Sequence, residues 1–370
     1  MKIPLFNPRP QHMHLVDEVL ERYRQAFADC DFTLGQSLKE FEKAFAQHVG
    51  ARHAVGVSSV TDALMVALRC LDIMPGDDVL VPAFGPISTV EVVARLFANP
   101  VLVDIEPHSY GLDPMKLQET LTEKSRAIMA VHLYGNPCTI DQIHQFADAS
   151  NLLVIEDVSQ AAGATYMNKK LGTFGLMGCF SFGPTSNLGA AGDGGMIVTD
   201  DDELAERLRR QREHGRSGDP FVYDEVGMDS SLDSFQSILL RRKLEELDES
   251  NADRIENARL YERLLANAPV KRPRFVDDGS HVYGHYTIEH DQRDQLQAFL
   301  AEKGIEAKAF YPLPYHLQPC FEYLEYTPGS FPVAEGVCRR VLSLPVYPGL
   351  KKREIEEVAA AIHEFFSVAV

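Results

Sequence analysis

Several polar residues stand where apolar, strand-like runs end, and their types suit chemistry at such positions. Ser59 and Thr61 lie in "SSVTDAL", where hydroxyls and the free amides of a helix start can hold a phosphate. Asp157 ends "LLVIEDV" and can pair with a protonated ring nitrogen. His132 lies near the end of the run "AIMAVHLY", two residues before its last residue. Ser181 precedes the glycine-rich turn "GAAGDGG", which can add phosphate donors. Each of these residues is a candidate for ligand binding or catalysis.

Each candidate also has a purely structural interpretation. Ser59 and Thr61 can cap a helix without any ligand, and an acid such as Asp157 more often ties down a loop. A lone histidine at a strand end, such as His132, is more often structural. A glycine-rich turn before a strand is usually only a turn. The order of these features along the chain is therefore more informative than any one of them.

The segments that must position these residues alternate between strand-like runs and helical patterns. Apolar or alternating runs lie at 53–59, 78–84, 100–105, 127–134, 152–158 and 179–182, and a further strand-like run follows the glycine-rich turn. Helical periodicity lies at 61–71, 88–97, 140–150 and 201–215. This alternation predicts βαβ units and a mostly parallel sheet with buried strands. Ligands of such sheets bind beyond the carboxyl ends of the strands, where the polar candidates lie.

The pattern changes near residue 236. Residues 235–268 form one long, highly charged helical pattern, which is a plausible bridge between domains. Proline-punctuated pieces follow, and the amphipathic "KREIEEVAAAIHEFF" comes near the end of the chain. We therefore predict an α/β domain over 1–244, with an N-terminal arm, and a smaller α+β domain over 245–370.

Composition narrows the class of protein. The 370 residues exceed one ordinary core, and 45% hydrophobic with 24% charged residues is the profile of a soluble globular protein. The net charge of −18 argues against nucleic acid or an anionic membrane as a partner, although a local group of donors can still bind a phosphate. The six cysteines form no CxxC pair, so neither a disulfide frame nor a metal site is expected. The chain starts without an apolar signal segment, and a cytoplasmic location is expected.

Nearly the whole chain resembles the DegT/DnrJ/EryC1/StrS sugar aminotransferases, which are pyridoxal-phosphate enzymes of fold type I. The resemblance lies in "TDAL", "PVLVDIEP", "AVHLYGNP", "VIEDVSQAAGA", "NLGAAGDGGMIVTDD", "LDSFQSILLRRKLEEL", "YPLPYHLQP" and "FPVAEGVCRRVLSLPVYP". It implies a large α/β domain with a mostly parallel, seven-stranded sheet and a smaller C-terminal α+β domain. It also implies a homodimer with sites at the subunit interface, and amination of nucleotide-linked keto sugars with glutamate as donor.

The resemblance also assigns roles to individual residues. Asp157 matches the acid that pairs with the pyridine nitrogen and keeps the ring an electron sink. Gln160 matches the glutamine near the cofactor's hydroxyl, and Thr61 and Ser181 match positions that hold the phosphate. The positions that the resemblance places around the cofactor are Ser59, Val60, Thr61, Pro86, Asp157, Gln160, Ser181, Ser186, Asn187 and Asp229.

The resemblance fails at the residue that the family's chemistry requires. The family places its Schiff-base lysine between Thr185 and Asn187, and this chain has Ser186 there. A serine hydroxyl cannot form that Schiff base, and its alkoxide pKa lies too far above neutral for a proton shuttle. Lys169 and Lys170 are predicted to lie in a solvated turn and so not to replace it. Ordinary transamination is therefore expected to be lost.

Further departures surround the same ligand position. Val60 stands where the family has a glycine that lets the backbone approach the phosphate. Pro86 replaces the ring-stacking aromatic residue, and Asp229 replaces an asparagine that reaches the site from the partner subunit. Gly284 stands where a histidine is common, although His285 follows directly. Several independent changes around one ligand indicate that the cofactor is not held in the family's way.

Three functional hypotheses follow. The first is a repurposed enzyme that acts on a sugar-like or nucleotide-linked substrate without a Schiff base. Its candidate acid–base and catalytic residues are His132, Asp157, Ser186, Tyr311 and His316. The second is an enzyme that holds pyridoxamine phosphate without a covalent bond, such as a sugar dehydratase or an aminotransferase. The third is a non-catalytic binding or regulatory partner of a biosynthetic enzyme. Under the first hypothesis the protein has no covalently bound cofactor. Under the second it binds pyridoxal or pyridoxamine phosphate.

Overall fold

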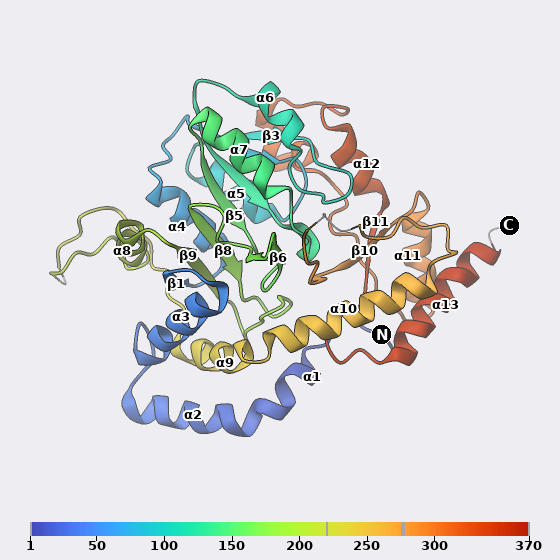
Figure 1. Cartoon of the computed structure of the whole chain (residues 1–370), viewed down its shortest axis with the longest axis horizontal. Helices are drawn as coiled ribbons and strands as arrows, with labels where there is room; N and C mark the ends of the chain where they lie inside the picture. The colour runs from blue at the N-terminus through green and yellow to red at the C-terminus, as the bar shows by residue number, and fades with distance from the viewer. Residues whose placement is uncertain (1, 220, 275–277, 369–370) are drawn as a thin grey trace.

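The described part of the chain forms one large sheet of seven strands and two small sheets of two strands each, β10-β11 and β6-β7 (Figure 1). The computed structural model describes residues 2–219, 221–274 and 278–368. The strands are β1 His53–Val57, β2 Asp78–Pro82, β3 Asn99–Val103, β4 Ser125–Val131, β5 Leu153–Asp157, β6 Thr165–Tyr166, β7 Lys169–Lys170, β8 Met177–Ser181, β9 Gly195–Thr199, β10 Tyr286–Glu289 and β11 Val341–Leu344.

The helices lie mostly between these strands. They are α1 Arg9–His12, α2 Val16–Asp29, α3 Gln36–Val49, α4 Val60–Cys70, α5 Ile87–Arg95, α6 Leu117–Thr120, α7 Ile140–Ser150, α8 Asp202–Gln211, α9 Ser234–Leu244, α10 Leu247–Leu264, α11 Arg293–Glu302, α12 Pro332–Arg340 and α13 Lys352–Val368. Short 3₁₀ helices are η1 Met13–Leu15, η2 Pro114–Lys116, η3 Leu133–Gly135, η4 Tyr315–Leu317 and η5 Pro319–Leu324.

The large sheet has the predicted, mostly parallel architecture. Its strand order is β1-β9-β8-β5-β4-β2-β3, which makes seven strands in the described part of the chain. The neighbours from β3 to β8 pair in parallel, and β9 pairs antiparallel with both β1 and β8. The prediction of an α/β fold with a mostly parallel, seven-stranded sheet is confirmed.

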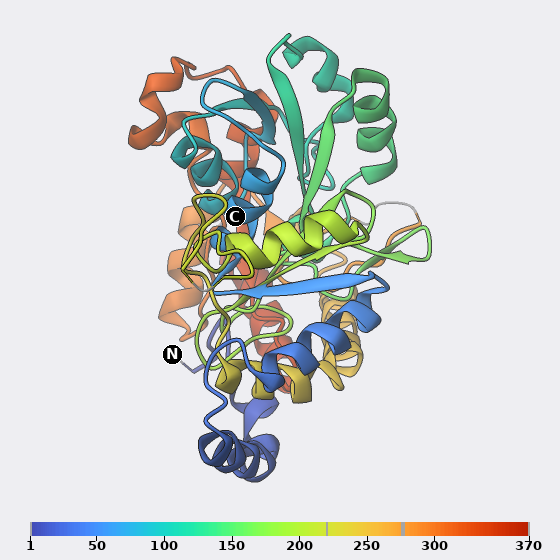
Figure 2. The same cartoon turned by 90° about the vertical axis from the view of Figure 1, so that its left-hand side faces the viewer.

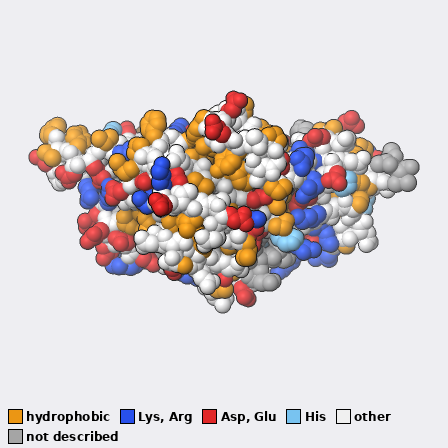
Figure 3. All heavy atoms as spheres, turned by 90° about the horizontal axis from the view of Figure 1, so that it is seen from above, with side chains coloured by type: hydrophobic (Ala, Val, Ile, Leu, Met, Phe, Trp, Pro, Cys, Tyr) orange, Lys and Arg blue, Asp and Glu red, His pale blue; other side chains and the backbone are white. Residues whose placement is uncertain are grey.

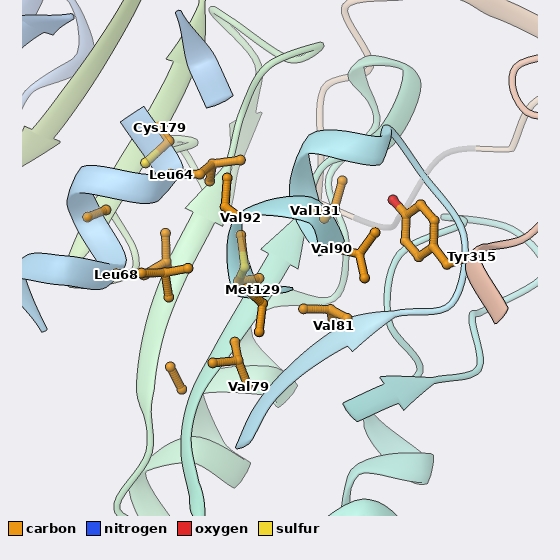
Figure 4. Close-up of a cluster of buried hydrophobic side chains, with 14 of the residues drawn as sticks. Leu64, Leu68, Val79, Val81, Val90, Val92, Met129, Val131, Cys179 and Tyr315 are labelled. Atoms are coloured by element: carbon orange, nitrogen blue, oxygen red, sulfur yellow. The ribbon is translucent and has the colours of Figure 1, made fainter. Parts of the chain in front are cut away.

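The apolar runs form strands because both faces of the sheet are covered. Val79 and Val81 of β2 belong to the core on the face of α4 and α5, whereas Leu80 between them belongs to the core on the opposite face. Alternate residues of a strand point to opposite faces, so a run that is apolar throughout can serve both cores. Figure 4 shows Val90 and Val92 of α5 among the buried side chains of this core, which include Val81 of β2 and Met129 of β4.

The long helical pattern of residues 235–268 is two helices, so that prediction is wrong in this detail. α9 ends at Leu244 and α10 begins at Leu247, with Glu245 and Glu246 between them. The two helices have different neighbours, because α9 contacts α2 and α3 whereas α10 contacts α13. The helix predicted at 201–215 is also shorter and ends at Gln211. The break after Leu244 lies at the predicted domain boundary, and the division into two domains stays a prediction.

A separate core surrounds the small sheet of β10 and β11. It joins residues of α10, α11 and α13 with Ile3 from the start of the chain.

Figure 2 shows α2 standing apart from the rest of the chain at one end of the molecule. Seen from the top of Figure 1, acidic and basic side chains are interspersed with hydrophobic ones (Figure 3). None of the described helices is both long and apolar enough to cross a membrane.

Candidate functional site

A cavity of about 230 Å³ lies where the segments after β5 and β8 meet the starts of α4 and α5. Two further segments, 284–285 and 310–311, complete its wall. The lining residues are Val60, Pro86, Ser88, Ser159, Gln160, Ser181, Thr185, Ser186, Asn187, Gly284, His285, Phe310 and Tyr311. A larger hollow of about 470 Å³ between α2, α3 and α9 contains none of the predicted site residues. The smaller cavity is therefore the candidate site.

Hydroxyl groups gather at the end of the cavity nearest the loop after β8. The Ser186 hydroxyl donates to the Ser181 hydroxyl at 3.0 Å, and the Gly183 amide donates to Ser181 at 3.2 Å. Val60, the first residue of α4, lines the same cavity. The Ser59 hydroxyl caps this helix by accepting a hydrogen bond from the Asp62 amide at 3.1 Å. Ser59 therefore has the helix-capping role that its structural interpretation predicted.

Gln160 connects the end of β5 to the opposite wall of the cavity. Its Oε1 accepts the Tyr134 amide at 2.8 Å, and its Nε2 donates to the Tyr311 phenol at 3.2 Å. Burial raises the pKa of Tyr311 to about 12, although the hydrogen bond from Gln160 opposes that rise. Tyr311 is therefore a neutral phenol near pH 7.

Asp157 lies behind the lining and has no exposed surface. Its Oδ2 accepts the Thr89 hydroxyl at 3.0 Å, and its Oδ1 accepts the Ser159 amide at 3.0 Å. A carboxylate oxygen accepts two hydrogen bonds, so each oxygen keeps capacity for a further donor. Ser159 lines the cavity, which places Asp157 directly beside the cavity wall.

Asn187 and Pro86 have structural as well as lining roles. The Asn187 amide donates to Asn251 of α10 at 2.7 Å and to the Val282 carbonyl at 3.2 Å. These bonds fix the loop that carries Ser186. The Pro86 carbonyl accepts the Tyr315 hydroxyl at 2.7 Å.

The two predicted histidines lie outside the cavity. His132 donates from Nε2 to Glu156 at 3.0 Å, while its Nδ1 accepts the Cys138 amide at 3.2 Å. The His132 and Glu156 side chains have no exposed surface. His316 is similarly buried and pairs with Glu335 at 3.0 Å. Both rings form buried pairs that hold structural elements together where they lie.

Asp229 and Thr61 are not among the lining residues either. The Asp229 side chain is 79% exposed and lies 4.0 Å from His214. Its predicted role concerns the site of a partner subunit, so it stays a prediction.

No lysine is found among the described residues that line the cavity. Lys169 donates to the Thr173 carbonyl at 2.5 Å, and Lys170 pairs with Asp248 at 3.2 Å. Lys243 of α9 is buried and donates to the Gly189 carbonyl, on the loop that also carries Ser186. Each of these amines is engaged away from the cavity.

Sequence reasoning did not include every residue of the wall among its candidates. Ser88, Ser159, Thr185, Phe310 and His285 line the cavity beside the predicted residues. The signal that could have found His285 is the histidine expected at position 284, one residue earlier.

The lining fits a phosphate-bearing cofactor. A Cβ at Gly183 would lie 3.6 Å from the Ser181 hydroxyl and 3.9 Å from the Ser186 hydroxyl, so the glycine leaves both hydroxyls uncovered. These hydroxyls and the start of α4 are donors that suit a phosphate. The predicted roles of Asp157 toward the pyridine nitrogen and of Gln160 toward the cofactor's hydroxyl stay predictions. No acidic side chain lines the cavity in the described chain to repel the phosphate.

Curated relatives cover almost the whole chain. A pleiotropic regulatory protein of Geobacillus stearothermophilus is 40% identical over 99% of both chains. A UDP-N-acetyl-3-dehydro-alpha-D-glucosamine 3-aminotransferase of Acidithiobacillus ferrooxidans is 39% identical over 97% of both.

Solved structures agree with the sequence relatives. DesV of S. venezuelae, in complex with a ketimine intermediate, superimposes with a TM-score of 0.96 at 37% identity and 98% coverage of both chains. NtdA of Bacillus subtilis with bound cofactor PMP superimposes with a TM-score of 0.93 at 28% identity, over 99% of this chain and 85% of NtdA. The sequence model of one family matches residues 14–363. The chain therefore belongs to the DegT/DnrJ/EryC1/StrS aminotransferase family.

Proposed function

We propose that this protein is an enzyme that binds a nucleotide-linked sugar and acts on it without a Schiff base to the protein. The observation that carries the proposal is the composition of the cavity wall. Hydroxyl, amide, phenol and imidazole groups line it, and no lysine lines it in the described chain. The relative from Acidithiobacillus ferrooxidans, named for a UDP-linked sugar, supports the substrate class.

Tyr311 is the proton donor of the proposed reaction. Its phenol oxygen accepts a hydrogen bond from Gln160, so its own proton can be donated to a ligand in the cavity. The raised pKa, about 12, keeps that proton on the phenol at neutral pH. Such a group suits a hydroxyl or carbonyl oxygen that gains negative charge during reaction.

The proposed assembly is a homodimer with the site at the subunit interface. The resemblance to the family supports both parts of this proposal, and exposed apolar side chains support the dimer alone. Phe221, Val226 and Phe27 are each more than half exposed, and exposed apolar surface of this kind is typical of protein interfaces.

The second candidate is an enzyme that holds pyridoxamine phosphate without a covalent bond. The specific observation in its favour is that Asp157, Gln160 and Ser181 are retained at or beside the cavity. NtdA, solved with bound PMP, supports it from within the family. When bound, that cofactor would supply an amino group and an electron sink.

One set of titrations tests both candidates. The wild-type protein is titrated by calorimetry with dTDP-glucose and UDP-N-acetylglucosamine, and by absorbance with pyridoxal and pyridoxamine phosphate. Binding of a sugar nucleotide without either cofactor supports the first candidate. Binding of pyridoxamine phosphate that dialysis removes supports the second. Binding of none of them contradicts both and favours the non-catalytic partner.

A further inference from the structure

The backbone around His285 is held tightly against the cavity. The His285 amide donates to the Tyr134 carbonyl at 3.1 Å, and the Val282 amide donates to the Gly135 carbonyl at 3.0 Å. Asn187, from the loop of Ser186, binds the Val282 carbonyl at 3.2 Å. Residues 282–285 are therefore fixed to both walls of the site before any ligand binds, which is the preorganisation that a binding residue needs.

Gly284 has no room for a side chain. A Cβ at this position would lie 2.4 Å from the Gln160 carbonyl oxygen and 3.2 Å from Oδ1 of Asn187. The first distance is shorter than a nonbonded contact allows, and the obstacle is backbone. A histidine at 284 therefore cannot be accommodated here, whereas the next residue, His285, lines the cavity.

The surroundings of the His285 ring keep it uncharged. Its centroid lies 4.6 Å from that of Phe310 and 5.9 Å from that of Tyr134. The Tyr134 hydroxyl also donates a hydrogen bond to the Phe310 carbonyl, which fixes Phe310 in the cavity wall. Burial, with a contribution from the Arg254 charge, lowers the pKa of His285 to about 3. A neutral imidazole offers one N–H donor and one nitrogen acceptor.

We propose that His285 is a substrate-binding residue that contacts a hydroxyl or carbonyl oxygen of the sugar ring. This inference rests on the proposed function and adds a residue that determines specificity. A sugar hydroxyl is both donor and acceptor, which matches a neutral imidazole. Together with Tyr311 and Ser186, His285 makes a lining without charged groups that favours a neutral, hydroxyl-rich ring.

The test compares a sugar nucleotide with the nucleotide alone. Calorimetry gives Kd for dTDP-glucose and for dTDP with the wild type, His285→Leu and His285→Gln. Leucine keeps an apolar side chain without hydrogen-bonding groups, and glutamine restores a donor and an acceptor. We expect His285→Leu to weaken dTDP-glucose binding about tenfold and dTDP binding less than twofold. His285→Gln should recover most of the lost affinity.

Two controls separate this inference from loss of folding. Thermal unfolding of each variant reports stability, and His108→Leu removes an exposed histidine outside the cavity without an expected change in Kd. Unchanged dTDP-glucose affinity in a folded His285→Leu protein overturns the inference and leaves the proposed function standing. Equal weakening for dTDP and dTDP-glucose also overturns it. If the wild type binds neither dTDP-glucose nor UDP-N-acetylglucosamine, the proposed function fails and this inference fails with it.

Discussion

The hydroxyl of Ser186 lies 3.0 Å from the hydroxyl of Ser181 and donates a hydrogen bond to it. The resemblance predicts that position 186 corresponds to the Schiff-base lysine and position 181 to a phosphate contact. Here both are neutral hydroxyls at one end of a cavity that no lysine lines in the described chain. If that prediction is right, position 186 supplies a hydrogen bond where the family supplies an amine.

Ser186→Lys should restore covalent attachment of pyridoxal phosphate. The Ser186 side chain lines the cavity beside the groups that suit the phosphate, so an amine placed there would reach a bound aldehyde. We expect borohydride reduction to attach the cofactor to most of the variant protein and to little of the wild type, as measured by intact mass. Thr185→Lys, one residue away, is the matched control. Equal labelling of the two variants would contradict the prediction.

Glu156→Gln should destabilise the fold, because the buried carboxylate accepts several hydrogen bonds. Glu156 accepts from His132 at 3.0 Å and from the Gly172, Phe174 and Gly175 amides at 2.6–2.7 Å. An amide nitrogen cannot accept, so we expect a loss of about 2–4 kcal/mol in the free energy of unfolding. Urea denaturation measures it, and the exposed Glu123→Gln should change stability by less than about 0.5 kcal/mol.

The same carboxylate predicts a dependence of stability on pH. Burial raises the pKa of Glu156, but hydrogen bonds from His132 and the backbone outweigh it and lower the pKa below its ordinary value. Its stabilisation is therefore present above the unfolded pKa of about 4.3 and is lost as pH falls through the lower folded value. In this acidic range the melting temperature of Glu156→Gln should fall less steeply than that of the wild type. Parallel melting curves would contradict this assignment.

Much of the fold could be predicted because its signals are local. The strand-like runs and the helices between them follow from apolar periodicity, and the confirmed sheet follows from their alternation. The break between Leu244 and Leu247 could not be predicted, because the helical pattern continues across it and the two helices differ in their tertiary neighbours.

The cavity wall was less predictable for a similar reason. Ser186 and Gln160 could be named because they stand in or near recognisable motifs. His285 lines the cavity because the backbone at Gly284 approaches Gln160 closely, and that approach joins segments far apart in the sequence.

Gly284→Ala should disturb both stability and the cavity. Its methyl group would lie 2.4 Å from the Gln160 carbonyl oxygen, so one of the two backbone segments must move. We expect a loss of about 1–3 kcal/mol, measured by urea denaturation. Gly218→Ala is the control, because a Cβ there has no atom within 4 Å. A Gly284→Ala protein as stable as the control would show that this backbone contact is loose.

Arg254→Met should leave the fold as stable as before or make it more stable. Arg254 of α10 is buried, and its Nη1 donates to the Tyr283 carbonyl at 3.3 Å. Its Nε and Nη2 have no hydrogen-bond partner among the described residues, and burial lowers its pKa to about 10. Burying a charge without a counter-charge costs free energy that methionine, of similar length, would not incur. We expect a gain of about 0–3 kcal/mol in the free energy of unfolding, measured by urea denaturation.

The matched control for this change is Arg259→Met. Arg259 lies on the same helix, is exposed, and pairs with Glu256 one turn away. Exposed pairs of this spacing contribute about 0.5 kcal/mol or less, so the control should be nearly neutral. A clear loss of stability in Arg254→Met alone would mean that the guanidinium is paired in solution. That partner would be one that the described residues do not provide, because they leave Nε and Nη2 without a hydrogen bond.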